Sequence, residues 1–266
     1  MKSIGLVGCG TLGQTILRAA AQGRLTPPVA GVTSRTRERA ERFLATLPAA
    51  PPFLDLDALI ERSGLVVEAA GGGAVPDLAR RVFAAGKDLL VISVGALLDH
   101  PRLLDEARER GCRLILPSGA IAGVDGIKSA CRGRIDRLLI TTRKPPGGLA
   151  GAPYLVERGI SLEGLTEERE LFNGPVREAC RGFPDNVNVS ATVSLAGLGP
   201  DRTQIRIVAV PGLQRNCHTI EVEGEFGRFL FQIENIPTEN PKTGRLTAMS
   251  ILRAIDDAMD PVRIGS

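Results

Sequence analysis

The sequence has no tryptophan, one tyrosine and two histidines among its 266 residues. Proteins that bind single-stranded nucleic acid stack bases on aromatic side chains, but aromatic residues make up only 3% of this chain. The formal net charge is only +3, and the basic residues are scattered rather than gathered into blocks. The composition therefore indicates neither a nucleic-acid partner nor binding to an anionic membrane.

Long hydrophobic runs and paired cysteines are also missing. The longest apolar runs, such as residues 89–94, have the length of a strand, well short of the ~20 residues that span a bilayer. The N-terminus enters a predicted strand rather than a signal peptide. The five cysteines form neither a C-x-x-C pair nor a zinc-binding spacing, so no metal site is predicted. We expect a cytoplasmic protein whose cysteines are small buried residues in a reducing compartment.

After the initial methionine the chain begins with KSIGLVGCGTLGQ, an apolar run followed by a G-x-G-x-x-G pattern. Gly8 would allow a tight turn, Gly10 would let a pyrophosphate approach the backbone, and Gly13 would let a helix pack closely on the strand. The N–H groups of a helix that begins at Thr11 and Leu12 would face the phosphates. These five residues predict a dinucleotide site. The alternative is a structural turn in an α/β domain.

The end of the second predicted strand, residues 28–33, bears on the choice of cofactor. NAD-binding sites usually carry Asp or Glu about 20 residues after the glycines, where it binds the ribose hydroxyls. This chain has Ser34 and Arg35 there, and a hydroxyl and a guanidinium group could hold the 2′-phosphate of NADP. We therefore expect NADP or NAD, with NADP favoured. Alternatively, Arg35, Arg37 and Arg39 are simply exposed at the start of a helix.

The first half of the sequence alternates between strand and helix patterns, which predicts a Rossmann-type, doubly wound parallel sheet. We expect this dinucleotide-binding domain to span residues 1–117. The glycines at 71–73, after the third strand, would let the nicotinamide half of the cofactor approach, or they form a surface turn. His100 lies at a helix start and is interpreted as a surface residue. Expected strands are 4–7, 28–33, 65–70, 88–94 and 112–116, and expected helices are 11–22, 37–45, 56–60, 74–85 and 101–110.

The second half predicts an α+β catalytic and dimerisation domain over residues 118–240, with a mainly antiparallel sheet and helices on one face. A glycine- and proline-rich segment after the first strand, KPPGGLAGAP, is expected to be a mobile loop. Residues 241–266 should hold an amphipathic helix that packs back on the first domain. Residues 118–133 have helical spacing, with small residues at the start that suit a helix N-terminus facing a ligand. Expected strands are 134–143, 204–210, 216–223 and 228–234, with a hairpin turn at 224–227, and the other expected helices are 175–181, 187–195 and 243–258.

His218 is the candidate catalytic residue, because it is the only histidine of the second domain and lies in a strand expected to face the cofactor. The alternative is a structural histidine in the core or on the surface. Cys217 should point to the opposite face of the strand, which argues against a Cys–His dyad, whereas Asn216 should share the face of His218.

Seven motifs spread along the chain occur together. They are GCGTLG (8–13), SVGAL (93–97), SGAIAGVD (118–125), TTRKPP (141–146), NVNVSATVSLAGLGPDRT (186–203), NCH (216–218) and NPKT (240–243). In this combination the chain resembles the L-aspartate dehydrogenase family of NAD(P)-dependent enzymes. The resemblance implies a Rossmann domain joined to an α+β catalytic domain, usually in a homodimer. It places Ala122 and Asn188 at cofactor-binding positions and His218 at the active-site histidine.

The resemblance also implies the reaction, which is oxidative deamination of L-aspartate to oxaloacetate and ammonia, or its reverse. Hydride would pass between Cα and the nicotinamide through iminoaspartate, which is hydrolysed or, in some family members, feeds NAD biosynthesis. A histidine with a pKa near the operating pH would suit the proton transfers. A dicarboxylate also needs cationic partners. Lys144 is the first candidate for binding the substrate, and the others are Arg143, Arg215 and Lys242.

Three alternatives stay open at this point. Dihydrodipicolinate reductase shares the two-domain plan, but its paired-histidine segment and adjacent lysine motif are absent. Homoserine dehydrogenase has a related domain plan, but the NVNVSATVSLAG segment of this chain fits that family poorly. A non-catalytic NADP(H)-binding sensor would use His218 as a structural residue only.

Overall fold

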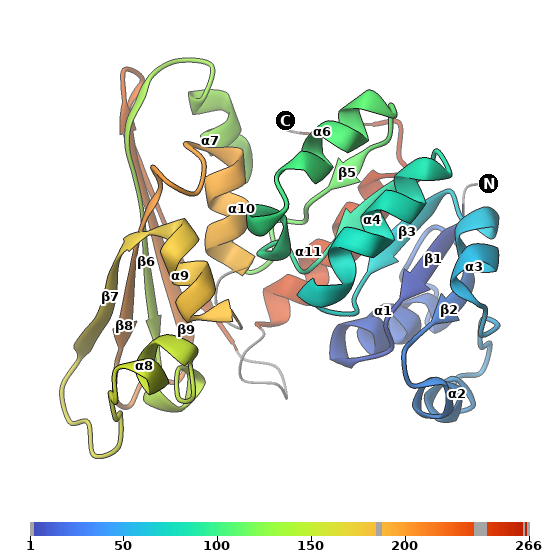
Figure 1. The fold of residues 1–266 in the computed structure, drawn as a ribbon, viewed down its shortest axis with the longest axis horizontal. Coiled ribbons are helices and arrows are strands. Elements are labelled where there is room, and N and C mark those ends of the chain that lie inside the picture. Colours follow the sequence, from blue (N-terminus) through green and yellow to red (C-terminus); the bar gives the residue numbers. More distant parts are fainter. Residues whose placement is uncertain (1–2, 185–187, 237–243, 263, 265–266) are drawn as a thin grey trace. The chain divides into compact units, whose positions relative to one another are not determined.

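The computed structural model describes residues 3–184, 188–236, 244–262 and 264 (Figure 1). The chain divides into two compact units. The first comprises Met1–Pro117 and Ala248–Arg263, and the second contains Ser118–Thr247. Within the described ranges, no helix is both long and apolar enough to cross a membrane.

The first unit is built on a five-stranded parallel sheet with the order β2-β1-β3-β4-β5. Its strands are β1 (Ile4–Val7), β2 (Val29–Thr33), β3 (Leu65–Glu68), β4 (Asp88–Val91) and β5 (Leu114–Ile115). The chain winds outward in both directions from β1 and β3, so these two neighbouring strands define the point where the strand order reverses. Ligands of open α/β sheets bind outside the carboxyl ends of the strands at this switch point.

An isolated parallel bridge between Val32 and Phe53 extends the sheet beyond β2. Two backbone hydrogen bonds support it, from Val32 N to Pro52 O and from Leu54 N to Val32 O, both 2.9 Å long. With this bridge counted as a short strand, the order becomes 3-2-1-4-5-6, the order of dinucleotide-binding folds. The proline-rich segment that carries Phe53 shows no strand pattern, which is why the sequence predicted only a connection there.

Apolar side chains alternate between the two faces of this sheet, and helices cover both. Ile4, Leu6 and Val67 join one buried cluster with side chains of α1 and α2, while Val66 and Val91 point to the other face, where α4 packs on β4. The helices that precede the second unit are α1 (Thr11–Ala21), α2 (Arg37–Leu44), α3 (Leu56–Arg62), α4 (Val75–Ala84), α5 (Ala96–Asp99) and α6 (Arg102–Glu109), with a 3₁₀ turn, η1, at Gly72–Ala74.

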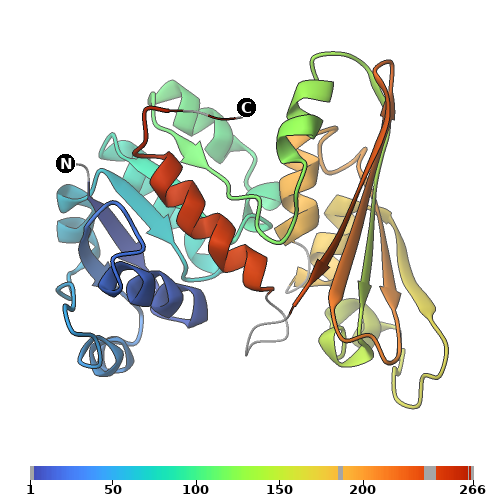
Figure 2. The same cartoon turned by 180° about the vertical axis from the view of Figure 1, so that it is seen from behind.

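The helix α11 (Arg245–Asp257) returns to this unit (Figure 2). Ile251 and Ile255 are fully buried in the same cluster as Ile4 and Leu6. Asp256 also accepts a hydrogen bond of 2.9 Å from the backbone N–H of Thr26. These contacts belong to residues that are far apart in sequence, so the hydrophobic effect rather than local preference fixes the place of α11.

The second unit is built on a five-stranded sheet with the order β10-β9-β6-β8-β7. Its strands are β6 (Ile135–Lys144), β7 (Arg169–Pro175), β8 (Gln204–Ala209), β9 (Asn216–Gly224) and β10 (Gly227–Asn235). All neighbours pair antiparallel except β6 and β8, which are parallel. The predicted α/β class with a second, mainly antiparallel sheet is confirmed, and so is the hairpin turn between β9 and β10.

Helices of the second unit gather on one face of its sheet (Figure 1). They are α7 (Val124–Ala130), α8 (Pro153–Glu157), α9 (Val176–Gly182) and α10 (Asn188–Ala196), with a 3₁₀ turn, η2, at Pro146–Gly148. The segment KPPGGLAGAP (residues 144–153) differs from the prediction of a plain loop, because it holds η2, buries Leu149 and ends at the first residue of α8. The side chains of Tyr154, Phe172 and Phe183 pack ring to ring around α8, with centroids 5.2–6.1 Å apart.

The prediction that all five cysteines are buried is wrong. Cys9 is buried, Cys131 is exposed, and Cys112, Cys180 and Cys217 are half-buried; none of the five forms a disulfide. Small size permits burial but does not require it. Cys180 and Cys217 lie in α9 (Val176–Gly182) and β9, whereas Cys112 and Cys131 lie outside the helices and strands.

Candidate cofactor and active site

The glycine turn after β1 has the geometry that its spacing predicts. Gly8 has φ +107°, a conformation that favours glycine, and a Cβ atom there would lie 2.3 Å from the backbone oxygen of Ala69. At Gly13 a Cβ atom would lie 2.2 Å from the backbone oxygen of Gly8. Gly8 therefore allows β1 and β3 to meet at the turn, and Gly13 allows α1 to pack against β1.

Gly10 differs from its neighbours because no protein atom lies within 4 Å of the place where its Cβ would be. Gly10 is exposed and is the N-cap residue of α1, without a side-chain cap. The first turn of α1 contains no acidic residue, so nothing on the helix itself opposes the positive end of its dipole. Backbone N–H groups at Thr11 and Leu12 are among those that have no partner within the helix. This open, positive helix start fits a pyrophosphate group.

The residues that follow β2 lie beside the glycine turn, because the N–H of Gly8 donates to the backbone oxygen of Thr33 over 2.8 Å. Ser34 is half-buried and Arg35 is exposed. Arg37 is held differently, since it pairs with Glu41 at 2.8 Å and its guanidinium lies 5.0 Å from the ring centre of Phe53.

The charge of Arg39 also acts at the turn. Burial raises the pKa of the Cys9 thiol, and the positive charge of Arg39 opposes that rise. Cys9 stands between Gly8 and Gly10, so the charge of Arg39 is felt inside the glycine turn. Among the three arginines at this helix start, Arg37 therefore fits the structural alternative, whereas Arg35 and Arg39 stay available to a phosphate.

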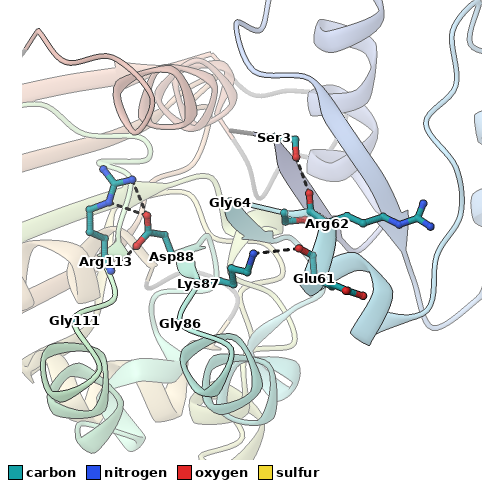
Figure 3. A pocket seen from close by; sticks show the side chains of 10 residues that line it. Ser3, Glu61, Arg62, Gly64, Gly86, Lys87, Asp88, Gly111 and Arg113 are labelled. Atoms are coloured by element: carbon teal, nitrogen blue, oxygen red, sulfur yellow. Dashed lines mark hydrogen bonds and ion pairs between the residues drawn. The ribbon is translucent and has the colours of Figure 1, made fainter. Parts of the chain in front are cut away.

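A cavity of about 630 Å³ lies at the opposite, amino edge of the same sheet (Figure 3). Three of its charged side chains are engaged with the protein, because Asp88 binds Arg113 and Lys87 donates to the backbone oxygen of Glu61 over 3.1 Å. Helices α3, α4 and α6 all end near this edge, and basic side chains at helix C-termini stabilise the negative end of the dipole. The cavity thus has a structural explanation. None of the predicted site residues lines it.

In the second unit, four polar side chains are buried together at one end of an apolar sheet face. Thr142 and Lys144 lie on β6, and Asn216 and His218 on β9, each 3–4% exposed. On β9 the alternation continues into the buried Ile220 and Val222. This confirms that Asn216 and His218 share a face.

His218 lies opposite Thr142 in the strand register, and its Nδ1 is 3.0 Å from the Thr142 hydroxyl oxygen. Burial, together with the positive charge of Lys144, lowers the pKa of His218 to about 3. The expectation of a pKa near neutral pH is therefore wrong for the protein without ligand. The sequence places His218 in a strand but does not show that it is buried beside a lysine.

The other predicted cations lie elsewhere. Arg143 is adjacent to Lys144 on β6. Its positive charge opposes the rise that burial causes in the pKa of the Cys217 thiol, which belongs to the opposite sheet face. Arg215 forms an ion pair of 2.9 Å with Glu234. Lys242 and the NPKT motif lie outside the described residues. Lys144 is thus the candidate that the structure brings together with His218.

Ala122 and Asn188 lie at the starts of two helices that pack on one another, α7 and α10. Ala122 is exposed in the segment before α7, and the exposed Asn188 is the first residue of α10. The strand β10 fixes the segment before α7, because the side-chain amide of Asn235 donates to the backbone oxygen of Ala120 over 2.7 Å. A Cβ atom at Gly123 would overlap the ring of Phe231.

The comparisons with known proteins agree for both halves of the chain. The family model of the aspartate dehydrogenase C-terminal domain matches residues 125–258, and that of the homoserine dehydrogenase NAD-binding domain matches residues 8–117. L-aspartate dehydrogenase of Methanosarcina acetivorans is 42% identical over 100% of both chains. The chain belongs to the L-aspartate dehydrogenase family. L-aspartate dehydrogenase 3 of Bordetella bronchiseptica is 40% identical over 99% of this chain and 97% of its own length.

Solved structures show the same fold. The aspartate dehydrogenase of Thermotoga maritima superposes with a TM-score of 0.75 at 24% identity, with both chains covered completely. A homoserine dehydrogenase of Thiobacillus denitrificans follows with a TM-score of 0.59 at 14% identity, covering 98% of this chain and 76% of its own. The predicted membership of the L-aspartate dehydrogenase family is confirmed, and with it an enzyme that carries an NAD-binding domain.

Sequence reasoning missed one member of the polar cluster, Thr142. Its signal was available, because Thr142 lies two residues before Lys144 in the TTRKPP motif and therefore shares its sheet face. What the motif does not reveal is the partner, since the contact with His218 joins two strands far apart in sequence.

Proposed function

We propose that this protein catalyses NAD(P)-dependent oxidative deamination of L-aspartate to oxaloacetate and ammonia through iminoaspartate, and the reverse reductive amination. The observation that carries the proposal is the neutral, buried His218 beside the cation of Lys144, in a chain about 40% identical to proteins named L-aspartate dehydrogenase. A base next to a cation suits a substrate that is both an amine and a dicarboxylate.

The cofactor site of the proposal is the glycine turn with the start of α1. Gly8 and Gly13 shape the turn, Gly10 leaves space for the pyrophosphate, and the N–H groups of Thr11 and Leu12 bind it. The bound cofactor supplies the hydride acceptor at C4 of the nicotinamide. Following the family resemblance, we assign Ala122 and Asn188 to cofactor binding as well.

We assign the 2′-phosphate of NADP to Ser34 and Arg35. Support comes from the absence of a carboxylate at these positions and from the exposed guanidinium of Arg35 beside the turn. Arg39, whose charge reaches Cys9, adds a second cation on the same side. A 2′-phosphate held by these residues would gain charge-assisted hydrogen bonds that the ribose of NAD does not offer.

His218 acts as the base in this scheme. With Nδ1–H donating to the Thr142 hydroxyl, Nε2 keeps its lone pair and accepts a proton from the substrate ammonium group. The imidazolium passes that proton to water, and Nε2 can then accept a proton from the water that adds to the imine. A neutral imidazole is ready for this role, because its low pKa leaves it unprotonated at neutral pH. Thr142 fixes the tautomer and the ring orientation.

Lys144 binds a substrate carboxylate and also tunes the base. Its charge lowers the pKa of His218 in the protein without substrate. A carboxylate placed against Lys144 offsets that charge, so the pKa of His218 rises when the substrate binds. The histidine therefore becomes a stronger base when a substrate carboxylate lies against Lys144.

The proposal also covers the organisation of the chain. Residues 1–117 serve as the dinucleotide-binding domain and residues 118–240 as the catalytic and dimerisation domain of a cytoplasmic homodimer, with the helix in 241–266 on the first domain. The iminoaspartate or oxaloacetate product suits a role in pyridine nucleotide biosynthesis.

The test is a steady-state assay of the purified protein. NADP⁺ or NAD⁺ should be reduced in the presence of L-aspartate, and NADPH or NADH oxidised with oxaloacetate and ammonia. Homoserine and L-malate are the controls and should give little turnover. Efficient reduction of a different imine with aspartate untouched would favour another imine reductase, and tight cofactor binding without any turnover would favour a sensor; either outcome contradicts the proposal.

A further inference from the structure

A single carboxylate, Glu68, is buried where the strand order of the first sheet reverses. Glu68 is the last residue of β3 and is completely inaccessible to solvent. Burying a carboxylate costs free energy unless hydrogen bonds replace those to water. The role of Glu68 therefore follows from the groups that donate hydrogen bonds to its carboxylate.

Five donors surround the carboxylate. Oε1 accepts from the backbone N–H groups of Ala70 and Gly71, each at 2.8 Å, and from the Ser93 hydroxyl at 3.1 Å. Oε2 accepts from the backbone N–H groups of Ile92 and Ser93, at 3.1 and 2.9 Å. One side chain thus ties the segment after β3 to the segment after β4.

The segment after β1 joins the same arrangement. The N–H of Ala69 donates to the backbone oxygen of Val7 over 2.7 Å. A Cβ atom at Gly8 would lie 2.3 Å from Ala69 O and 2.7 Å from Ala70 N. The glycine turn therefore packs directly against the backbone at Ala69 and Ala70. Glu68 accepts hydrogen bonds from the N–H groups of Ala70 and Gly71 in the same segment.

We propose that Glu68 is the positioning residue of the cofactor site, which fixes the segments after β1, β3 and β4 before the dinucleotide binds. The inference rests on the proposed function in that these segments receive a pyridine nucleotide. Glu68 acts through the backbone at Ala70, Gly71 and Ser93 and contacts no reacting atom.

The effect depends on a carboxylate rather than on a side chain of the same shape. In Glu68→Gln an NH₂ group replaces one of the two oxygens. It then faces either the three donors of Oε1 or the two donors of Oε2. Those donors lose their acceptor, and the segments must rearrange. The cofactor then has to order them on binding, so the cost appears in the cofactor dissociation constant.

A matched control exists in the same unit. Asp88 also accepts several hydrogen bonds, from the backbone N–H and the guanidinium of Arg113, but at the amino edge of the sheet (Figure 3). Asp88→Asn makes the same acid-to-amide change without touching the three segments. It reports what the loss of a half-buried carboxylate does to stability alone.

The experiment measures the dissociation constants of NADPH and NADH by fluorescence titration, with Tm and the KM for aspartate at saturating cofactor. Glu68→Gln should raise the dissociation constant for the preferred nucleotide at least tenfold and change the KM for aspartate less than threefold. Asp88→Asn should lower Tm and leave nucleotide binding within twofold of wild type. If Glu68→Gln does not fold, Ser93→Ala takes its place with an expected two- to fivefold weakening.

Hydrogen exchange gives a readout without ligand. The amides of Gly71 and Ser93 should be protected in the wild type and exchange faster in Glu68→Gln. Nucleotide binding within twofold of wild type in Glu68→Gln, or in Ser93→Ala if only that variant folds, overturns the positioning role alone. A wild-type protein that binds neither nucleotide overturns the proposed function, and with it this inference.

Discussion

His218 and Lys144 illustrate how burial changes what a residue can do. In solution an imidazole titrates near pH 6.5, but burial beside a positive charge lowers the pKa of His218 to about 3. The unfolded chain therefore binds a proton between these two values and the folded chain does not. Folding stability from this residue is complete above pH 6.5 and is lost as the pH falls from 6.5 toward 3.

This linkage gives a prediction for His218→Asn, which removes the titrating group. Between pH 7 and pH 5 the wild type should lose about 2 kcal/mol more stability than the variant, because 1.5 pH units of linkage correspond to roughly 1.36 kcal/mol each. Urea unfolding at the two pH values measures the difference. His100→Asn, at the exposed second histidine, controls for the loss of a histidine as such. Equal pH dependence in wild type and His218→Asn would contradict the buried neutral state.

The arginines after β2 give a second prediction at this scale. Arg35→Ala should lower kcat/KM for NADP by about 10- to 100-fold, as expected for a lost charged hydrogen bond, and leave kcat/KM for NAD unchanged. Arg37→Ala is the matched control, because Arg37 is held by Glu41 and Phe53. A wild type that prefers NAD tenfold, or an Arg35→Ala variant that uses NADP as well as the wild type, would remove the basis for NADP.

Residue roles could be predicted from the sequence where a local motif carries them. The glycine triplet and His218 are examples, since spacing and the scarcity of histidine single them out. Thr142 and Glu68 could not, because their contacts join segments 76 and 24–25 positions apart. A carboxylate at the end of the apolar run LVVE was the available signal for Glu68, since a buried strand rarely ends in a charge without a reason.

At the scale of elements, different glycines of the turn between β1 and α1 are expected to affect cofactor binding and folding stability. Gly10→Ala should leave the stability unchanged or raise it by about 0.4–1 kcal/mol, because alanine restricts the unfolded chain, and Gly10 has φ −81° with open space at its Cβ position. The same methyl group would occupy the space of the pyrophosphate, so the dissociation constant for NADPH should rise at least tenfold.

Gly13→Ala is the contrasting variant for this turn. Its Cβ would lie 2.2 Å from the backbone oxygen of Gly8, so we expect a loss of about 1–3 kcal/mol in stability from overpacking. Thermal unfolding and fluorescence titration of both variants measure the two effects. Unchanged NADPH binding by Gly10→Ala would show that the open space at Gly10 does not receive the phosphates.

Most elements of the first unit follow from their sequence pattern, with ends that shift by a few residues. The second unit shows where pattern fails. The strand β7 was missed because five of its seven residues, among them Arg169 and Glu170, are polar or are glycine or proline, as is common at a sheet edge. The parallel pairing of β6 with β8 was missed because strand direction depends on the connection between strands, which sequence alternation does not report.

For the whole molecule, the account assigns the two compact units different tasks. The first carries the glycine turn and the carboxylate that positions it, and the second carries the histidine, threonine and lysine of the acid–base chemistry. Family membership and the two-sheet class were predicted from motifs spread over the full chain and are confirmed by relatives about 40% identical over their whole length. The division of tasks remains our proposal.

The most direct measurement is the kinetics of His218→Asn with the cofactor dissociation constant determined in parallel. The account predicts that kcat for aspartate oxidation falls by about 10²- to 10⁴-fold, the usual contribution of a general base, while the dissociation constant for NADPH stays within twofold of wild type. A variant that oxidises aspartate with kcat within threefold of the wild type would contradict the assignment of His218 as the base.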